Sequence, residues 1–315
     1  MKNKTIIPIT FALDDNFIPF LATSIDSIIK HASTDYEYKF YVFHNGLSKK
    51  NIEKFSSYSS FGFTVDFINV NDKINEVNHK ICVRDNYSEA IYYRFFIPEI
   101  LRQYDKVIYI DCDTILVDDI ANLFNTDLGD NLLGAVVDEA VAGVQIFREY
   151  VLKYLSVPQP KYFNSGVLLF NAKKCREVDL EGMFIKMLNK VVFKVAPDQD
   201  FLNVICKDKV KYLDLSWNKL ATPSSFDEKN LKLIHYNLNF KPWHFDGITY
   251  ENYFWDIARN SKFYDEILSI KNNYGEKEKA ISNKNFEKLI ILCEECIKNS
   301  DNSPVKKEDF FDGIK

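Results

Sequence analysis

The chain has 315 residues, of which 46% are hydrophobic and 15% aromatic, enough to bury the core of one large α/β domain or two small ones. A formal net charge of −5 and a pI of about 5.7 argue against a nucleic-acid-binding surface, which needs clustered basic side chains. No apolar run approaches the ~20 residues of a membrane span, and residues 6–9, after a basic N-terminus, are too few for a signal sequence. We therefore expect a cytoplasmic protein without a transmembrane segment.

Strand-like and helix-like segments alternate along the first third of the chain. Apolar, β-branched and aromatic runs predict strands, whereas apolar residues three or four apart predict helices. The β-α-β-α order implies a mainly parallel sheet with helices on both faces. The predicted strands are residues 6–12, 38–43, 63–70 and 107–110, and the predicted helices are residues 17–31, 47–58 and 88–104.

The remainder of the chain predicts further strands at residues 132–137, 167–170 and 231–236, and helices at 180–192 and 250–268. From residue 275 onward, charges of both signs surround one predicted apolar helix at residues 286–297, and residues 300–315 form a predicted solvated tail. We expect a catalytic domain at 1–245, an aromatic helical segment packed on it at 246–274, and a charged helical appendage and tail at 275–315. Cys293 and Cys296 have the C-x-x-C spacing of metal and redox sites, but the chain has no second such pair. We therefore expect both to be core positions of a helix.

The apolar run 107–110 ends abruptly in Asp111-Cys112-Asp113. In an open α/β sheet, ligands bind just beyond the carboxyl ends of the strands. Two carboxylates at that place form an oxygen-rich site for Mg²⁺ or Mn²⁺ and, through the metal, for a phosphate. The alternative is that one aspartate caps a loop and the other faces water. Their position at the end of a buried run favours the metal.

Asp14, Asn16 and Phe17 follow the first predicted strand. One interpretation is that the polar pair caps the next helix. The other is that a carboxylate and an amide hydrogen-bond the edge of a nucleobase while Phe17 stacks on it. The residues alone leave both open.

Three more polar features follow predicted elements. Arg94 lies among apolar residues of a predicted helix and should pair with a carboxylate, for which Asp111 is a candidate. Residues 197–200, Pro-Asp-Gln-Asp, open a helix with side chains that are ordinary at a helix N-terminus. His235 ends the last predicted strand, where a histidine is more often structural than a ligand.

Taken in order, these motifs resemble glycosyltransferase family 8, which contains bacterial lipopolysaccharide α-galactosyl- and α-glucosyltransferases and glycogenin. The resemblance runs from Thr10 to about Leu268, and its specificity lies in the ordered set rather than in any one motif. The matching segments are residues 11–16, 93–94, 107–113, 127–130, 162–169, 197–203, 235–236 and 241–243.

The resemblance implies a GT-A fold: a Rossmann-like, mixed and mainly parallel central sheet flanked by helices, here with a helical C-terminal extension. It implies UDP-galactose or UDP-glucose as donor, a Mn²⁺ or Mg²⁺ cofactor, a glycan acceptor and retention at the anomeric carbon. It implies Asp111, Asp113 and His235 as metal ligands and Lys241 at the diphosphate. The residues that it implies around the uridine are Ala12, Asp14, Asn16 and Phe17, and those around the donor sugar are Arg94, Asp111, Asp138, Asn164, Ser165, Asp198 and Gln199.

Arg94, Asp198 and Gln199 are the expected catalytic residues. Gln199 occupies the place of a nucleophile in the motif, but an amide is a poor nucleophile, so we expect no stable glycosyl-enzyme. The chain departs from the family at Leu238, which stands where many members carry a glycine between the histidine and Lys-Pro-Trp. This departure argues against a backbone contact to phosphate there.

Two other functions fit parts of the sequence. Asp111 and Asp113, followed by Thr114, also resemble the strand-end nucleophile motif of haloacid-dehalogenase-like phosphatases, although that motif normally follows the first strand. A non-catalytic nucleotide-sugar-binding module would need the same pocket without turnover. The acceptor, which can be lipid-, protein- or saccharide-linked, is not encoded in any motif, and peripheral contact with a membrane stays open.

Overall fold

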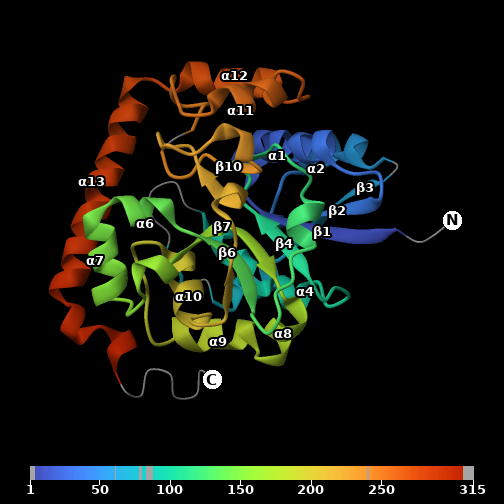
Figure 1. Ribbon diagram of the computed structural model, residues 1–315. Helices are drawn as coiled ribbons and strands as arrows, with labels where there is room; N and C mark the ends of the chain where they lie inside the picture. The colour runs from blue at the N-terminus through green and yellow to red at the C-terminus, as the bar shows by residue number, and fades with distance from the viewer. Residues whose placement is uncertain (1–3, 61, 78–79, 83–87, 240, 308–315) are drawn as a thin grey trace.

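The computed structural model of the protein describes residues 4–307 except 61, 78–79, 83–87 and 240 (Figure 1). Its centre is a seven-stranded sheet in the order β3-β2-β1-β4-β7-β6-β8. β7 is antiparallel to both of its neighbours, and every other pairing in this sheet is parallel. The predicted mixed, mainly parallel sheet is therefore confirmed. The strands are β1 (Thr5–Ala12), β2 (Tyr36–His44), β3 (Phe63–Asn69), β4 (Val107–Ile110), β6 (Leu133–Val137), β7 (Phe163–Phe170) and β8 (Val210–Tyr212).

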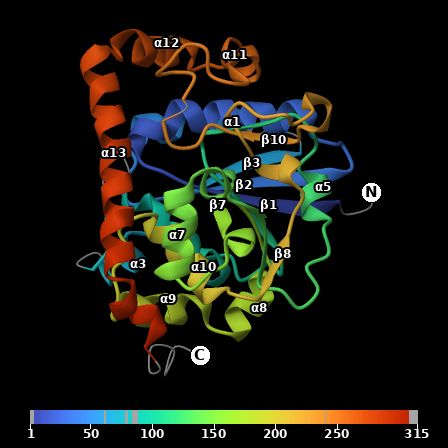
Figure 2. The ribbon, with the colours of Figure 1, turned by 60° about the vertical axis from the view of Figure 1, so that its left-hand side comes forward.

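Helices cover both faces of this sheet (Figures 1 and 2). α1 lies along one face with α11 and α12 above it, and α8, α9 and α10 lie on the opposite face. The helices before residue 160 are α1 (Ile18–His31), α2 (Lys49–Lys54), α3 (Asn71–Asn75), α4 (Ile97–Ile100), α5 (Ala121–Phe124), α6 (Glu139–Gly143) and α7 (Gln145–Lys153). Those after it are α8 (Ala172–Glu177), α9 (Leu180–Leu188), α10 (Pro197–Ile205), α11 (Glu251–Ala258), α12 (Tyr264–Asn273) and α13 (Glu276–Lys298).

The alternation of side chains along β4 divides the core into two hydrophobic clusters. Val107 and Tyr109 face the cluster that includes Phe184 and Phe201, whereas Ile108 and Ile110 face the cluster beneath α1. A strand buried on both faces must be apolar at every position. This explains why residues 107–110 form an unbroken apolar run and why the first carboxylates appear only where the strand ends.

A second, three-stranded sheet carries the histidine of the predicted site. It consists of β5 (Thr114–Leu116), β9 (Lys219–Leu220) and β10 (Leu233–His235), in the order β5-β10-β9. β10 is antiparallel to β5, and their register sets His235 opposite Thr114. Because Thr114 directly follows Asp113, this pairing brings His235 to the two aspartates.

The predicted helix at residues 88–104 differs from the observed structure. The segment forms a 3₁₀ helix, η3 (Glu89–Phe96), followed by the single turn of α4. Pro98 has no backbone N–H to bond the carbonyl of Arg94, so a continuous α-helix cannot pass through it, and α4 begins there with proline in its first turn. The tighter winding leaves five consecutive residues, 92–96, buried.

The C-terminal part also differs from the predicted elements. The expected helix at 250–268 is two helices, α11 and α12, separated at residues 259–263, and the expected helix at 286–297 is part of the 23-residue α13. The tail is not wholly solvated, since Ser303 and Val305 are buried and Ser303 Oγ donates to the Tyr154 carbonyl at 2.5 Å. Residues 308–315 of the expected tail lie outside the described residues.

Both C-terminal segments contribute to the two hydrophobic clusters that flank the central sheet. Phe254 of α11 joins the cluster beneath α1, and Leu289 and Cys293 of α13 join the other. Cys293 is buried and Cys296 half-buried, and neither forms a disulfide. The three-part division of the chain stays a prediction.

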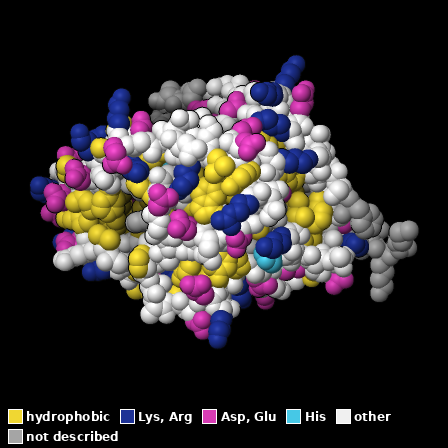
Figure 3. Space-filling model, turned by 90° about the horizontal axis from the view of Figure 1, so that it is seen from above, with side chains coloured by type: hydrophobic (Ala, Val, Ile, Leu, Met, Phe, Trp, Pro, Cys, Tyr) yellow, Lys and Arg dark blue, Asp and Glu magenta, His cyan; other side chains and the backbone are white. Residues whose placement is uncertain are grey.

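Among the helices that the structure describes, none combines the length and apolar character that crossing a bilayer requires. Seen from above, acidic and basic side chains are interspersed, with small hydrophobic patches between them (Figure 3). This mixture is what a chain with a small net negative charge is expected to show.

Candidate active site

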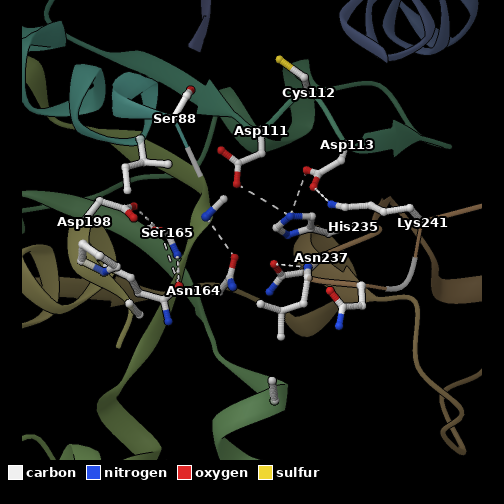
Figure 4. Close-up of a pocket in the computed structure, with 18 of the residues that line it drawn as sticks. Ser88, Asp111, Cys112, Asp113, Asn164, Ser165, Asp198, His235, Asn237 and Lys241 are labelled. Atoms are coloured by element: carbon white, nitrogen blue, oxygen red, sulfur yellow. Dashed lines mark hydrogen bonds and ion pairs between the residues drawn. The ribbon is translucent and has the colours of Figure 1, made fainter. Parts of the chain in front are cut away.

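Two neighbouring strand ends bring the predicted metal ligands together. Asp111 and Asp113 follow β4, and His235 ends β10. One ligand atom from each of the three residues lies within 4.8 Å of the other two. Figure 4 shows the two carboxylates and the imidazole turned toward one another. Lys241 reaches Asp113 from the side away from Asp111.

The cluster fits a divalent cation. His235 Nε2 and Asp113 Oδ1 are buried 3.2 Å apart, and neither has a hydrogen-bond partner. His235 Nδ1 lies 2.9 Å from Asn218 Oδ1, while Asn218 Nδ2 donates to Asn164 Oδ1 at 2.9 Å, which orients the amide. Because an amide oxygen only accepts, Nδ1 carries the proton and Nε2 presents its lone pair to the cluster. Carboxylate oxygens with one imidazole form a donor set suited to Mn²⁺.

Asp113 is held ionised by its neighbours. Burial favours the neutral acid, but the Lys241 ammonium opposes it and holds the pKa of Asp113 below its usual range. Lys241 Nζ forms an ion pair and hydrogen bond with Asp113 Oδ2. A permanently charged carboxylate is the form that a metal requires.

Gly166 leaves the space in which this cluster fits. β7 pairs with β4, and Asp111 N donates to the Gly166 carbonyl at 2.8 Å. A Cβ atom on Gly166 would lie 2.7 Å from Asp111 Oδ2 and still closer to His235 Cε1. No side chain larger than hydrogen is compatible with the observed positions of these two residues.

Arg94 connects the metal cluster to α10. Its side chain is 3% exposed, and its two terminal nitrogens lie 3.2 Å from Asp111 Oδ1 and 3.1 Å from Asp198 Oδ2. The guanidinium lies 4.4 Å from the centre of the Tyr109 ring, and Tyr109 donates its hydroxyl to Asp111 Oδ1 at 2.6 Å. The predicted pair with Asp111 is present, and Asp198 is a second partner. A buried arginine between two carboxylates offsets their mutual repulsion.

The polar side chains of β7 and α10 form one hydrogen-bonded network. Gln199 Oε1 accepts from Ser165 N at 3.0 Å, and Gln199 Nε2 donates to Asp138 Oδ2 at 3.0 Å. Asp138 Oδ2 also accepts from Asn164 Nδ2 at 3.0 Å, and Ser165 Oγ donates to Asp198 Oδ2 at 2.8 Å. Both ends of the Gln199 amide are therefore bonded, which fixes its orientation.

Asp200, one turn into α10, is a buried acid of a different kind. Its carboxyl group accepts from Tyr162 at 2.6 Å, from Tyr150 at 2.7 Å and from Ala196 N at 3.1 Å. Burial raises the pKa of Asp200 to about 7, and these hydrogen bonds only partly oppose the effect. Asp200 thereby ties the first turn of α10, which carries Asp198 and Gln199, to α7 and to the segment before β7.

The residues after β1 line the same cavity, and because β1 pairs in parallel with β4, they follow a strand end that adjoins Asp111. Asp14 accepts the Asn16 backbone N–H at 2.9 Å, so the capping interpretation is observed for Asp14. The Phe17 ring lies 6.0 Å from that of Phe20, which stacks on Trp243 at 3.8 Å. A contact with a nucleobase is compatible with this capping geometry.

Leu238 has a φ of +53°, in the left-handed region. A leucine there costs roughly 1–2 kcal/mol relative to ordinary backbone. Its N–H is bonded to Asn237 Oδ1 at 2.7 Å, and the next residue, Asn239, donates to the Ser282 carbonyl of α13 at 3.1 Å. The backbone therefore keeps a conformation that a glycine would adopt without strain.

All the predicted site residues line a single cavity of about 640 Å³. They are Ala12, Asp14, Asn16, Phe17, Arg94, Asp111, Asp113, Asp138, Asn164, Ser165, Asp198, Gln199, His235 and Lys241. The sequence did not single out the supporting residues Asn218, Tyr109, Tyr150 and Tyr162. In the sequence, each of these residues appears only as a polar group in an otherwise apolar segment. Many core residues share this pattern, so it does not identify residues that support a site.

The sequence model described as glycosyl transferase family 8 matches residues 8–247. The chain belongs to this family. It is accordingly a hexosyltransferase, as its relatives also indicate. Membership of this family excludes the two alternative functions, a haloacid-dehalogenase-like phosphatase and a non-catalytic nucleotide-sugar-binding module.

Curated relatives in family 8 match most of the chain. It is 28% identical over 265 residues to general stress protein A of Bacillus subtilis strain 168, covering 77% of this chain and 89% of that protein. It is 29% identical over 302 residues to lipopolysaccharide 1,2-glucosyltransferase of Escherichia coli K12, covering 87% of this chain and 86% of that protein.

Solved structures support the GT-A fold. Galactosyltransferase LgtC, in complex with donor and acceptor sugar analogs, matches with a TM-score of 0.69 and 29% identity over 81% of this chain and 96% of LgtC. The bifunctional glycosyltransferase WbbM matches with a TM-score of 0.71 and 26% identity over 86% of this chain, which spans about half, 52%, of the WbbM chain.

Gly166→Ala is expected to destabilise the protein by roughly 1–3 kcal/mol, because the new methyl group overpacks the site between Asp111 and His235. Urea unfolding followed by circular dichroism measures the difference. Gly143→Ala is the matched control, since a Cβ there meets no atom within 4 Å. Equal stability of the two variants would show that the cluster tolerates displacement.

Asp200→Asn tests the raised pKa of the buried acid. The pKa of Asp200 is about 7 in the folded protein and 3.8 in the unfolded chain. Between pH 3.8 and about 7, the folded wild type therefore binds one proton that the unfolded chain has lost. Its stability relative to the variant should therefore fall, by at least about 1 kcal/mol, as the pH rises from about 4 to 7. Urea unfolding across this range measures the trend. Asp208→Asn, at an exposed ion pair, should show no such trend, and a flat difference for Asp200→Asn contradicts the assignment.

Proposed function

We propose that the protein is a retaining, Mn²⁺- or Mg²⁺-dependent transferase that moves galactose or glucose from its UDP derivative to a glycan acceptor. The observation that carries this proposal is a pair of buried atoms without a hydrogen-bond partner, Asp113 Oδ1 and His235 Nε2, whose residues line the cavity. A buried polar atom without a partner costs roughly 1–3 kcal/mol, which a bound cation would offset.

Asp111, Asp113 and His235 would hold the metal. When bound, the metal acts as a Lewis acid that neutralises negative charge on the departing diphosphate. Lys241, in the loop after β10, would add a positive charge. Its ammonium pairs with Asp113 in the structure, and it would pair with phosphate oxygens when UDP is bound. Ala12, Asp14, Asn16 and Phe17 would surround the uridine in the same cavity.

The donor sugar would lie between Asp138, Asn164, Ser165 and α10. Asp198 faces this region with its charge shared with Arg94, and it can stabilise positive charge that develops on the sugar ring. Gln199 has both amide atoms bonded to Ser165 and Asp138, so its role is to orient the sugar rather than to attack it. The acceptor oxygen would attack the anomeric carbon from the face that UDP leaves, as the bond to the UDP oxygen breaks and the hydroxyl proton passes to the departing diphosphate, which retains the configuration.

The neighbouring proteins inform the choice of substrates. The names of two similar proteins specify a lipopolysaccharide 1,2-glucosyltransferase and a galactosyltransferase studied with donor and acceptor sugar analogs. We infer a saccharide acceptor and a cytoplasmic location, a compartment that keeps thiols reduced, since none of the six cysteines forms a disulfide. Peripheral contact with a membrane-anchored acceptor is compatible with this proposal.

UDP and Mn²⁺ together should raise the melting temperature by about 3 °C or more beyond the sum of their separate effects, because each completes the site of the other. Differential scanning fluorimetry measures this synergy. Asp113→Asn removes one ligand charge and should abolish the synergy while the protein remains folded. Asp130→Asn, on the surface beside Lys174, is the matched control. If Asp113→Asn keeps the full synergy, the metal assignment is wrong.

Asp198→Asn should lower turnover by about 10²–10³-fold, because an amide cannot offset positive charge on the sugar. Gln199→Ala should retain more activity than Asp198→Asn, and UDP affinity should stay near that of the wild type in both. Radiometric transfer assays and calorimetry measure the two quantities. Equal losses in the two variants would contradict the division of roles.

Proton NMR of the product tests retention directly. An α-linked product from the α-linked donor is expected. A β-linked product would refute retention, and a sugar covalently trapped on Gln199 would refute attack by the acceptor without a glycosyl-enzyme.

A further inference from the structure

The active-site cavity continues past α10 to a second end between α7 and α13. These two helices run side by side in both ribbon views (Figures 1 and 2). Tyr150 and Ala196 line the passage from the donor-sugar region to this end. Phe147 of α7, with Asn285 and Phe286 of α13, line the end itself.

The two ends of the cavity differ in charge. Among the described residues that line it, every Asp, Arg and Lys belongs to η3, to the segments that follow strand ends, to α10 or to the loop with Lys241, whereas α7 and α13 contribute none. An occupant of the α7–α13 end therefore meets apolar side chains and the amide of Asn285, without a fixed charge. This environment suits a neutral group better than a phosphate or carboxylate.

Phe286 is unusual for a phenylalanine of this protein. Among the phenylalanines that the structure describes, it alone is exposed, at 42% of its surface. Its ring lies 6.3 Å from that of the buried Phe147 at an interplanar angle of 82°, so one edge is supported while the remainder is accessible from the cavity. An aromatic ring that is fixed in place but still accessible can pack on the apolar face of a sugar ring. A neighbouring amide can hydrogen-bond the sugar hydroxyl groups.

We propose that Phe286 and Asn285 of α13 form the binding subsite for a neutral acceptor saccharide. This inference rests on the proposed function, because the acceptor hydroxyl must enter the same cavity as the donor sugar. Residues 276–298 lie beyond the 8–247 segment that the family model matches. The subsite therefore lies outside the segment that the family model matches, and it sets which acceptor is used.

Saturation-transfer NMR with methyl glycosides tests the subsite in the presence of UDP and Mg²⁺, a diamagnetic substitute for Mn²⁺. The probes are the methyl α- and β-glycosides of glucose, galactose and N-acetylglucosamine, each compared with its octyl counterpart. Phe286→Ala should weaken binding of the preferred methyl glycoside by about five- to tenfold, as expected for loss of one aromatic contact. Phe286→Trp should restore binding, and Asn285→Ala should weaken it.

Ile281→Ala is the matched control, because Ile281 is an exposed residue of α13 that does not line the cavity. Unchanged glycoside affinity in Phe286→Ala, or an equal loss in Ile281→Ala, would overturn the proposal. Binding of octyl but not methyl glycosides would also overturn it, in favour of an apolar chain in this end of the cavity.

Calorimetric titration with UDP separates this inference from the proposed function. If wild-type protein binds UDP with Mg²⁺ but none of the methyl glycosides at millimolar concentrations, the acceptor subsite is wrong while the donor site stands. If it binds neither, the proposed function fails as well.

Discussion

Buried negative charge at the carboxyl end of β4 is the constraint to which the surrounding structure is fitted. Asp111, Asp113 and Asp198 lie close together, and such a group is stable only when positive charge and hydrogen bonds compensate it. Arg94 bridges two of these acids and Lys241 pairs with the third. The 3₁₀ winding of η3, the pairing of β10 with β5 and the missing side chain at Gly166 all serve to bring the compensating groups within reach.

The site could be predicted from the sequence to the extent that its chemistry is local. Asp111 and Asp113 adjoin an unbroken apolar run, so the strand and its end are visible in the residues themselves. The support for the site was not visible, because it depends on distant partners. Asn218 orients His235, and Tyr150 and Tyr162 hold Asp200, only because the fold brings together segments that lie 17 to 50 residues apart.

The fold shows the same division between local and distant causes. The strands were predictable because a strand buried on both faces must be apolar at every position, as in residues 107–110. The helix at 88–104 was predicted wrongly because apolar spacing does not distinguish α from 3₁₀ winding. Pro98, in the first turn of α4, interrupts the helix that the spacing predicted. The early start of α13 could not be read from apolar spacing, because its first two turns are mostly polar.

The leucine at position 238 makes one part of the molecule depend on another. A glycine would hold the turn before Lys241 in its left-handed conformation without help, but leucine favours other conformations when it is unrestrained. Part of the restraint comes from α13, through the bond between Asn239 and the Ser282 carbonyl. The turn that leads to Lys241 in the active site therefore depends in part on a helix that lies outside the segment matched by the family model.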